Sequence, residues 1–277
     1  MALAQPAGRT FGAAVADLRR GWVQRPLWGH LGWQDIRQRY RRSFLGPIWI
    51  SITMAVTAVA LGILYAGLFD AHIDVLLPHL LVGFIIWNFI SGCVAEGAEV
   101  FTANEGLITH LPAPLSVHVY RLVWRQTLFL LHNMAVYLVM LFIFPQHLHW
   151  TVLYALPAFV LLAVNGAWVA LLLGIVSTRY RDLVPIVQSI MQLAFFMTPI
   201  VWIYQELLNS PNPKVRERAS IAEFNPFLHF LEIVRAPLLG QDQQVHHWVV
   251  VLAITVGGWA LALLALRRFR ARVPYWV

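Results

Sequence analysis

The sequence contains one lysine and one cysteine among 277 residues, and only 12% of its residues are charged. The lone Lys214 does not stand in a Gly-x-x-x-x-Gly-Lys-Ser/Thr loop, so the chain lacks a Walker-type cradle for nucleotide phosphates. The motifs of zinc proteases and serine hydrolases, His-Glu-x-x-His and Gly-x-Ser-x-Gly, are also absent. Because Cys93 is the single cysteine, no disulfide can form within the chain. We therefore expect neither ATP hydrolysis nor a catalytic site here, and a membrane-embedded enzyme is the weaker class.

Hydrophobic residues make up 59% of the sequence, and its mean hydropathy is +0.66. A soluble domain needs more polar groups than this, so most apolar surface must face lipid or other helices. Several runs are long enough, at about 1.5 Å per helical residue, to cross a hydrocarbon core of about 30 Å. They are about 47–69, 76–94, 122–144, 152–176, 184–203 and 248–266. The expected fold is an all-α integral membrane protein with six transmembrane helices.

Basic residues set the expected orientation. Six spans place both termini on one side, and sixteen of the twenty Lys and Arg residues then share that side. The positive-inside rule puts these ends in the cytoplasm, with residues 1–27 as a cytoplasmic tail. The net charge is +7, and the arginines lie beside apolar runs. This position favours anionic lipid headgroups over nucleic acid as their binding partner.

A basic segment precedes the first span. Over residues 28–45, Leu31, Ile36, Tyr40 and Phe44 lie on one side of a helix and arginines lie on the other. This pattern is typical of a helix on a membrane surface, and Gly46-Pro47 then turns the chain into the first span. The alternative is an ordinary basic flank of a first transmembrane helix. The residues assigned to this interface helix are Arg37, Arg39, Tyr40, Arg41 and Arg42.

A cytoplasmic connection at about 96–114 is too long to be a simple turn. It combines acidic residues with an apolar row and ends at Pro112-x-Pro114, which predicts a short helix with a mixed surface for a cytoplasmic partner. An amphipathic connector lying on the membrane is an equal alternative. The residues assigned to docking are Glu99, Glu105, Leu107, Ile108 and Leu111.

The external connection at about 204–247 has a polar first half and an apolar second half. The apolar half begins at Asn225-Pro226 and is too short to span, which is typical of a re-entrant or interfacial helix. The residues assigned to this external segment are Pro226, Phe227, Phe230 and Arg235.

Histidines near the predicted outer face occur as two pairs, His147 with His149 and His246 with His247. Imidazoles bind transition metals, but no cysteine or carboxylate is placed beside either pair to complete a site. We expect no metal in this chain.

Four separated motifs, in matching places relative to the spans, resemble one family. They are Arg37-x-Arg39-Tyr40 followed by Ser43-x-Leu45-Gly46-Pro47-x-Trp49, Thr178-Arg179-Tyr180-Arg181-Asp182, Phe195-Phe196-Met197-Thr198-Pro199-Ile200, and Asn225-Pro226 with Arg235. From about residue 28 onward the chain resembles the Wzm-type permease subunits of type-2 ABC exporters for O-antigen, teichoic acid or galactan. Residues 104–108, 116–121 and 272–277 are similar to the galactan exporter of mycobacteria and their relatives.

The resemblance implies a role for each unusual segment. Residues 28–45 resemble the interface helix, 96–114 the coupling helix that docks on an ATPase, and 204–247 the external gate helices; 46–277 then form the transmembrane domain. In that family two permeases pair with two ATPase subunits, which bind ATP and Mg, and lipid-linked glycan passes between the permeases in the inner membrane. The alternatives are a type-2 ABC permease for a smaller lipid or drug, and a stand-alone flippase or glycosyltransferase acting on polyprenyl-linked glycan.

A sliding glycan favours flat aromatic faces over fixed charges, which would bind it too tightly at one place. Aromatic residues away from the interfacial belts or near bends are therefore candidates for a substrate channel, although each ring has packing as an equal alternative. The candidates are Tyr65, Trp87, Phe195 and Phe196.

Overall fold

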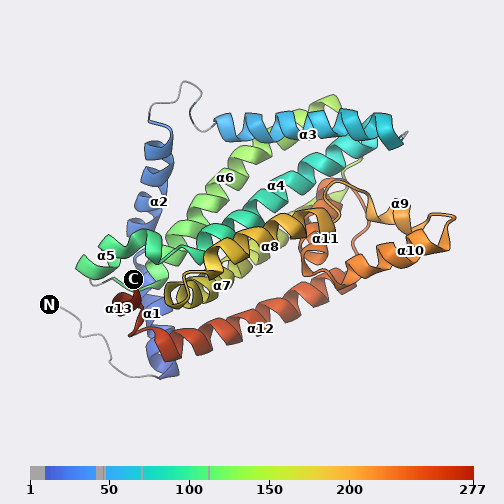
Figure 1. The fold of residues 1–277 in the computed structure, drawn as a ribbon. Coiled ribbons are helices and arrows are strands. Elements are labelled where there is room, and N and C mark those ends of the chain that lie inside the picture. The colour runs from blue at the N-terminus through green and yellow to red at the C-terminus, as the bar shows by residue number, and fades with distance from the viewer. Residues whose placement is uncertain (1–9, 42–45, 47, 70, 112) are drawn as a thin grey trace.

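The computed structural model describes residues 10–41, 46, 48–69, 71–111 and 113–277, and every regular element in them is a helix (Figure 1). Five helices are long and apolar enough to cross a membrane. They are α3 (Ile48–Phe69), α4 (Ile73–Ala98), α6 (Ser116–Ile143), α7 (Ala155–Arg179) and α12 (Val245–Phe269). The chain is thus an all-α integral membrane protein, as predicted.

The fifth predicted span, 184–203, is shorter in the structure. Helix α8 (Leu183–Met197) has 15 residues and ends before Thr198-Pro199. Proline has no backbone N–H, and it disfavours helical geometry at the preceding residue, so the helix stops there although the apolar sequence continues. Among the described helices, five therefore meet the length of a span and α8 is the shorter apolar helix beside them.

Helix α4 lies at the centre of the bundle. It packs against α3, α6, α7, α8 and α11, and its middle is buried through Leu80, Ile85 and Ile86. Close approach to α7 depends on Gly97, where an added Cβ would lie 2.8 Å from the Cα of Ala170. By contrast α3 exposes most of its apolar surface, as a helix facing lipid does.

Two helices precede the first span. Helix α1 (Phe11–Val23) begins at Thr10, whose hydroxyl accepts a hydrogen bond from the Ala13 N–H at 3.2 Å. It falls within the predicted 1–27 tail, for which no helix was predicted. Helix α2 (Arg25–Arg39) runs across the direction of the long helices (Figure 1). The predicted interface helix 28–45 thus begins earlier and its regular part ends at Arg39; residues 42–45 lie outside the described part.

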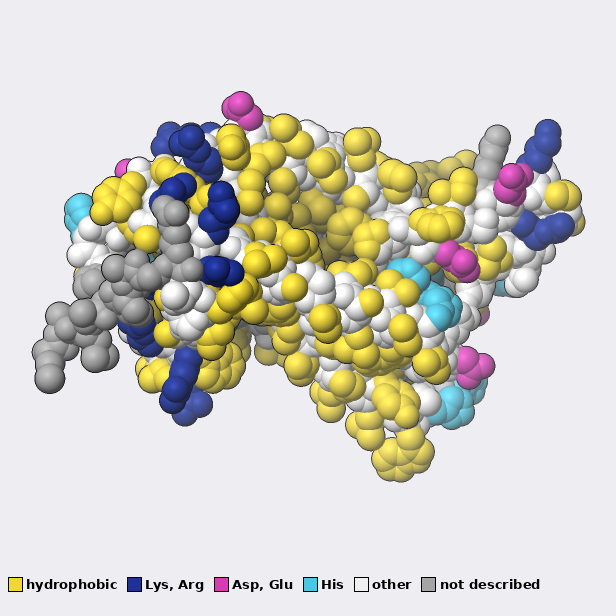
Figure 2. All heavy atoms as spheres, turned by 90° about the horizontal axis from the view of Figure 1, so that it is seen from below, with side chains coloured by type: hydrophobic (Ala, Val, Ile, Leu, Met, Phe, Trp, Pro, Cys, Tyr) yellow, Lys and Arg dark blue, Asp and Glu magenta, His cyan; other side chains and the backbone are white. Residues whose placement is uncertain are grey.

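Short helices cap the two ends of the bundle. The end that holds α1 and the C-terminus also holds α5 (Glu105–His110) and α13 (Val273–Trp276), while α9 (Tyr204–Leu208) and α10 (Pro213–Ser220) extend from the opposite end (Figure 1). The remaining short helices are η1 (Thr102–Asn104), η2 (Trp150–Tyr154), η3 (Ile221–Phe224) and α11 (Pro226–Leu238). Figure 2 shows most of the visible Lys and Arg side chains at one end of the molecule, a few at the opposite end, and hydrophobic side chains over the middle.

Candidate functional site

An ionic cluster joins α2 to α4 and α6. The Arg121 Nε donates to Asp35 at 2.8 Å, and the Arg125 Nη1 donates to the same carboxylate at 2.9 Å. Arg125 also donates to Glu96, at the end of α4, and the Arg121 Nη1 donates to the Asn104 side chain in η1 at 3.0 Å. Two arginines of α6 thus tie the surface helix to the segment predicted to dock a partner.

The charge state of Asp35 is fixed at neutral pH. Burial raises the pKa of Asp35, but the hydrogen bonds and charges of Arg121 and Arg125 outweigh it, so the pKa lies below its usual value. A lowered carboxyl pKa stabilises the folded state above the unfolded value of about 3.9, and this contribution is lost as pH falls through the folded pKa. Asp35 therefore stays ionised across the physiological range.

The predicted docking residues differ in exposure. Glu105 and Leu111 are exposed, Leu107 and Ile108 are half-buried, and Glu99 accepts a hydrogen bond from Gln188 of α8 at 3.2 Å. The segment is anchored by Val100 and Phe101, which are buried between α7 and the rest of the core. The segment is therefore held in place at its start, and Glu105 and Leu111 are the exposed members of the predicted docking set.

The predicted interface residues differ in exposure. Ile36 is buried and Tyr40 packs half-buried beside Leu128 and Phe129 of α6, while Arg37 and Arg41 are exposed. The Arg39 guanidinium lies over the Phe129 ring at 5.6 Å. The predicted residue Arg42 lies outside the described residues.

Two of the motifs meet at the opposite end. Asn225 caps α11 by accepting from the Phe227 N–H at 3.0 Å, and its amide donates to the Thr198 hydroxyl at 2.9 Å. Arg235 is fully buried, and its Nη1 donates to the Pro199 carbonyl at 2.8 Å. Helix α11 is thus fastened to the turn that ends α8, a contact that the sequence did not predict.

Aromatic rings form a continuous cluster between α4, α8 and α11. The Trp87 ring lies 5.8 Å from Phe195 and 5.4 Å from Phe227, and Phe195 contacts Phe196 at 5.2 Å. Trp87 is buried and Phe196 is exposed. Of the four channel candidates, three therefore come together, joined by Phe227 of the predicted external segment. Tyr65 is half-buried on α3.

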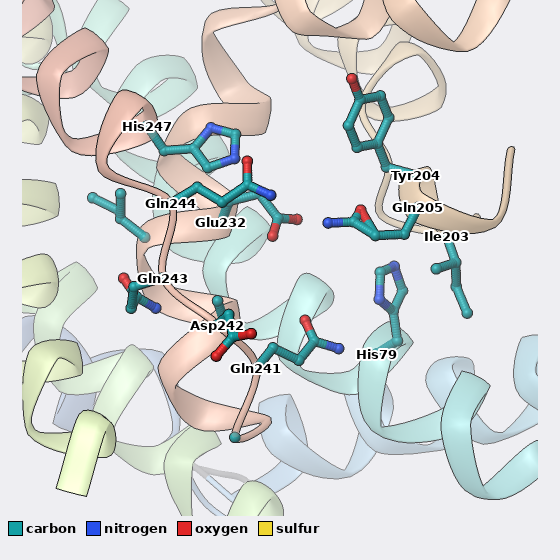
Figure 3. A pocket seen from close by; sticks show the side chains of 13 residues that line it. His79, Ile203, Tyr204, Gln205, Glu232, Gln241, Asp242, Gln243, Gln244 and His247 are labelled. Atoms are coloured by element: carbon teal, nitrogen blue, oxygen red, sulfur yellow. The ribbon is translucent and has the colours of Figure 1, made fainter. Parts of the chain in front are cut away.

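A polar cavity of about 490 Å³ opens beside α11. Figure 3 shows His79, Gln205 and Tyr204 on one side of it, and Glu232, Gln244 and His247 on the other. The backbone of 240–244 closes one edge. No local motif marks this cavity, because its residues come from α4, α9, α11 and the start of α12.

Comparison with known proteins identifies a family and a relative that this chain resembles. Residues 26–239 match the ABC-2 type transporter family. The chain is also similar to the O-antigen export system permease protein RfbA of Myxococcus xanthus, with 24% identity over 170 residues. That similarity covers 61% of this chain and 65% of the relative, so the chain spans less than two thirds of the relative's length. The family match includes the ionic cluster, the aromatic cluster and α11.

Proposed function

The chain belongs to the ABC-2 type transporter family, and we propose that it is the transmembrane subunit of an ATP-driven exporter of lipid-linked polysaccharide. The observation that carries the proposal is the similarity to an O-antigen export permease over 170 residues. The cargo would be of the O-antigen, teichoic acid or galactan type. Two copies of the chain would pair with two ATPase subunits that bind ATP and Mg.

The ionic cluster supports this role, because it links a surface helix, a projecting segment and two long helices of the bundle. A movement imposed on the 96–111 segment would reach α2, α4 and α6 together. A permease that is driven by a separate ATPase needs such a connection between the segment that docks the ATPase and the long helices of the bundle.

Cells depleted of the chain test this function. They are expected to retain full-length lipid-linked polysaccharide inside, where a lectin labels it only after permeabilisation. Restoring the chain should return the label to intact cells. Unchanged surface polysaccharide after depletion would contradict the proposed cargo.

The proposed orientation places both termini in the cytoplasm of a cell with this exporter in its inner membrane. In a Cys93→Ala background, single cysteines at Asn209 and Ala271, which are both exposed, report the two ends of the bundle. An impermeant thiol reagent on intact cells is expected to label position 209 alone. Labelling of 271 and not 209 would reverse the orientation.

The exposed ring of Phe196, which packs against the rest of the aromatic cluster, offers a sliding surface for sugar C–H faces. Phe196→Leu keeps an apolar side chain at an exposed position, so we expect normal assembly with export reduced about tenfold or more, if stacking lowers the barrier by at least about 1.4 kcal/mol. Phe142→Leu is the matched control, because Phe142 is exposed on α6. Export rate and the amount of assembled subunit are measured separately. Normal export by Phe196→Leu would remove this residue from the conduit.

A further inference from the structure

We propose that His229, His246 and His247 form a binding site for one Zn²⁺ ion. One ring nitrogen from each of the three histidines lies within 4.8 Å of the other two. His229 comes from α11, whereas His246 and His247 open α12. The sequence showed only the adjacent pair, and the fold adds the third imidazole from 18 residues away. The pair lies beyond the residues that match the family.

The hydrogen bonds of His229 prepare it to bind a metal. Its Nε2 lies 2.9 Å from the Glu223 carbonyl oxygen, which can only accept, so this nitrogen carries the proton. The Nδ1 of His229 is then unprotonated and faces the Nδ1 of His247 at 2.7 Å. A ligand histidine whose second nitrogen donates to a backbone carbonyl is the usual arrangement at zinc sites.

The spacing suits a small ion after a minor adjustment. Zn–N bonds of about 2.0 Å at tetrahedral angles place two ligand nitrogens about 3.3 Å apart. The two Nδ1 atoms must therefore separate slightly, and Zn²⁺ replaces the proton that they share. The ring of His246 lies 3.8 Å from that of His247 and is exposed, so it can turn toward the ion.

The fourth ligand position would face the polar cavity. His247 lines this cavity, so a water molecule can complete the coordination. Figure 3 shows the side chains of His247 and Glu232 on the same side of the space. Three imidazoles with an oxygen ligand suit Zn²⁺, whereas Mg²⁺ and Ca²⁺ prefer oxygen ligands throughout.

Bound Zn²⁺ would clamp α11 to the start of α12. Helix α11 carries Arg235 and the cap to the α8 turn, so the clamp would hold the whole external segment. The ion would therefore regulate how readily this segment moves.

Zn²⁺ titration of the full chain in lipid nanodiscs, with any polyhistidine tag removed, tests the site. Isothermal calorimetry is expected to give one ion per chain, and Co²⁺ in its place should give the visible absorption of a tetrahedral site. His246→Ala removes an exposed ligand and is expected to weaken binding at least about tenfold, as is His229→Gln. His149→Ala, an exposed histidine at the same end, serves as the control and should bind as the parent does.

Three results would overturn the site. They are the absence of stoichiometric Zn²⁺ binding by the parent chain, unchanged affinity in His246→Ala, and equal weakening in the His149→Ala control. Because His246 is exposed, its variant is expected to fold normally, and a thermal unfolding curve matching that of the parent confirms this.

Discussion

Arg235→Met is expected to lower the free energy of unfolding by about 3–5 kcal/mol, the range for breaking a buried ion pair from one side. Arg235 is fully buried, and its Nη1 lies 3.4 Å from Glu232 and 2.8 Å from the Pro199 carbonyl. Methionine fills similar space but leaves the Glu232 carboxylate without its cation. Helix α11 would then lose one of its two attachments to the α8 turn, and export should fall with it. Denaturant titration in detergent measures the first effect.

A double variant separates charge from packing. Arg235→Met combined with Glu232→Leu removes both charges, so most of the lost stability should return. Arg216→Met is the matched control, because Arg216 is an exposed arginine of α10 in the same external segment. It is expected to change stability by less than about 0.5 kcal/mol. A double variant no more stable than Arg235→Met alone would show that the ion pair is not what Arg235 contributes.

Arg125→Met is expected to weaken the attachment of α2 to the end of α4. Arg125 bridges Asp35 and Glu96; with methionine, the distant Arg39, at 3.9 Å, is the one cation among the described residues that still pairs with the Glu96 carboxylate. The side chains of Arg125 and Asp35 retain 15–18% exposure, so the loss should be about 2–3 kcal/mol, below that of a fully buried pair. We also expect that the partner ATPase still binds this variant and still hydrolyses ATP, but that polysaccharide is no longer exported.

The control and the rescue for Arg125 use the same elements. Arg37→Met places the same change on an exposed arginine of α2 and should leave export normal. Adding Glu96→Gln to Arg125→Met removes the uncompensated carboxylate and should restore part of the stability. If Arg125→Met exported at the parental rate, the ionic cluster would have no part in coupling.

Local sequence patterns identified the long helices because apolar runs of spanning length require helical backbone in lipid. They misjudged α8, since hydropathy continues to residue 203 while Thr198-Pro199 ends the helix. Helix α1 was missed because tertiary contacts support it: the Ser116 N–H donates to buried Asp17 at 3.1 Å, and Gly21 lets α6 approach. No such contact is visible in a single segment.

The same limit applies to the candidate sites: local patterns marked individual residues but not the contacts between them. Motifs marked Thr198, Asn225 and Arg235 as notable but did not predict that they touch one another. Asp35 lies in the predicted basic helix, yet its partners Arg121 and Arg125 are 86 and 90 residues away, and no contact between them and Asp35 was predicted. Long-range pairing of charges is set by how helices pack, which periodicity along one helix does not encode.

Transport into inside-out vesicles tests the central claim most directly. The chain and its partner ATPase are reconstituted together with lipid-linked polysaccharide on the outer face, and an added glycosidase reports how much glycan is still accessible. The account predicts that ATP makes the glycan resistant to the enzyme, that omitting either protein abolishes this protection, and that Arg125→Met abolishes it while ATP is still consumed. Protection without ATP, or protection by the chain without its partner, would contradict the account.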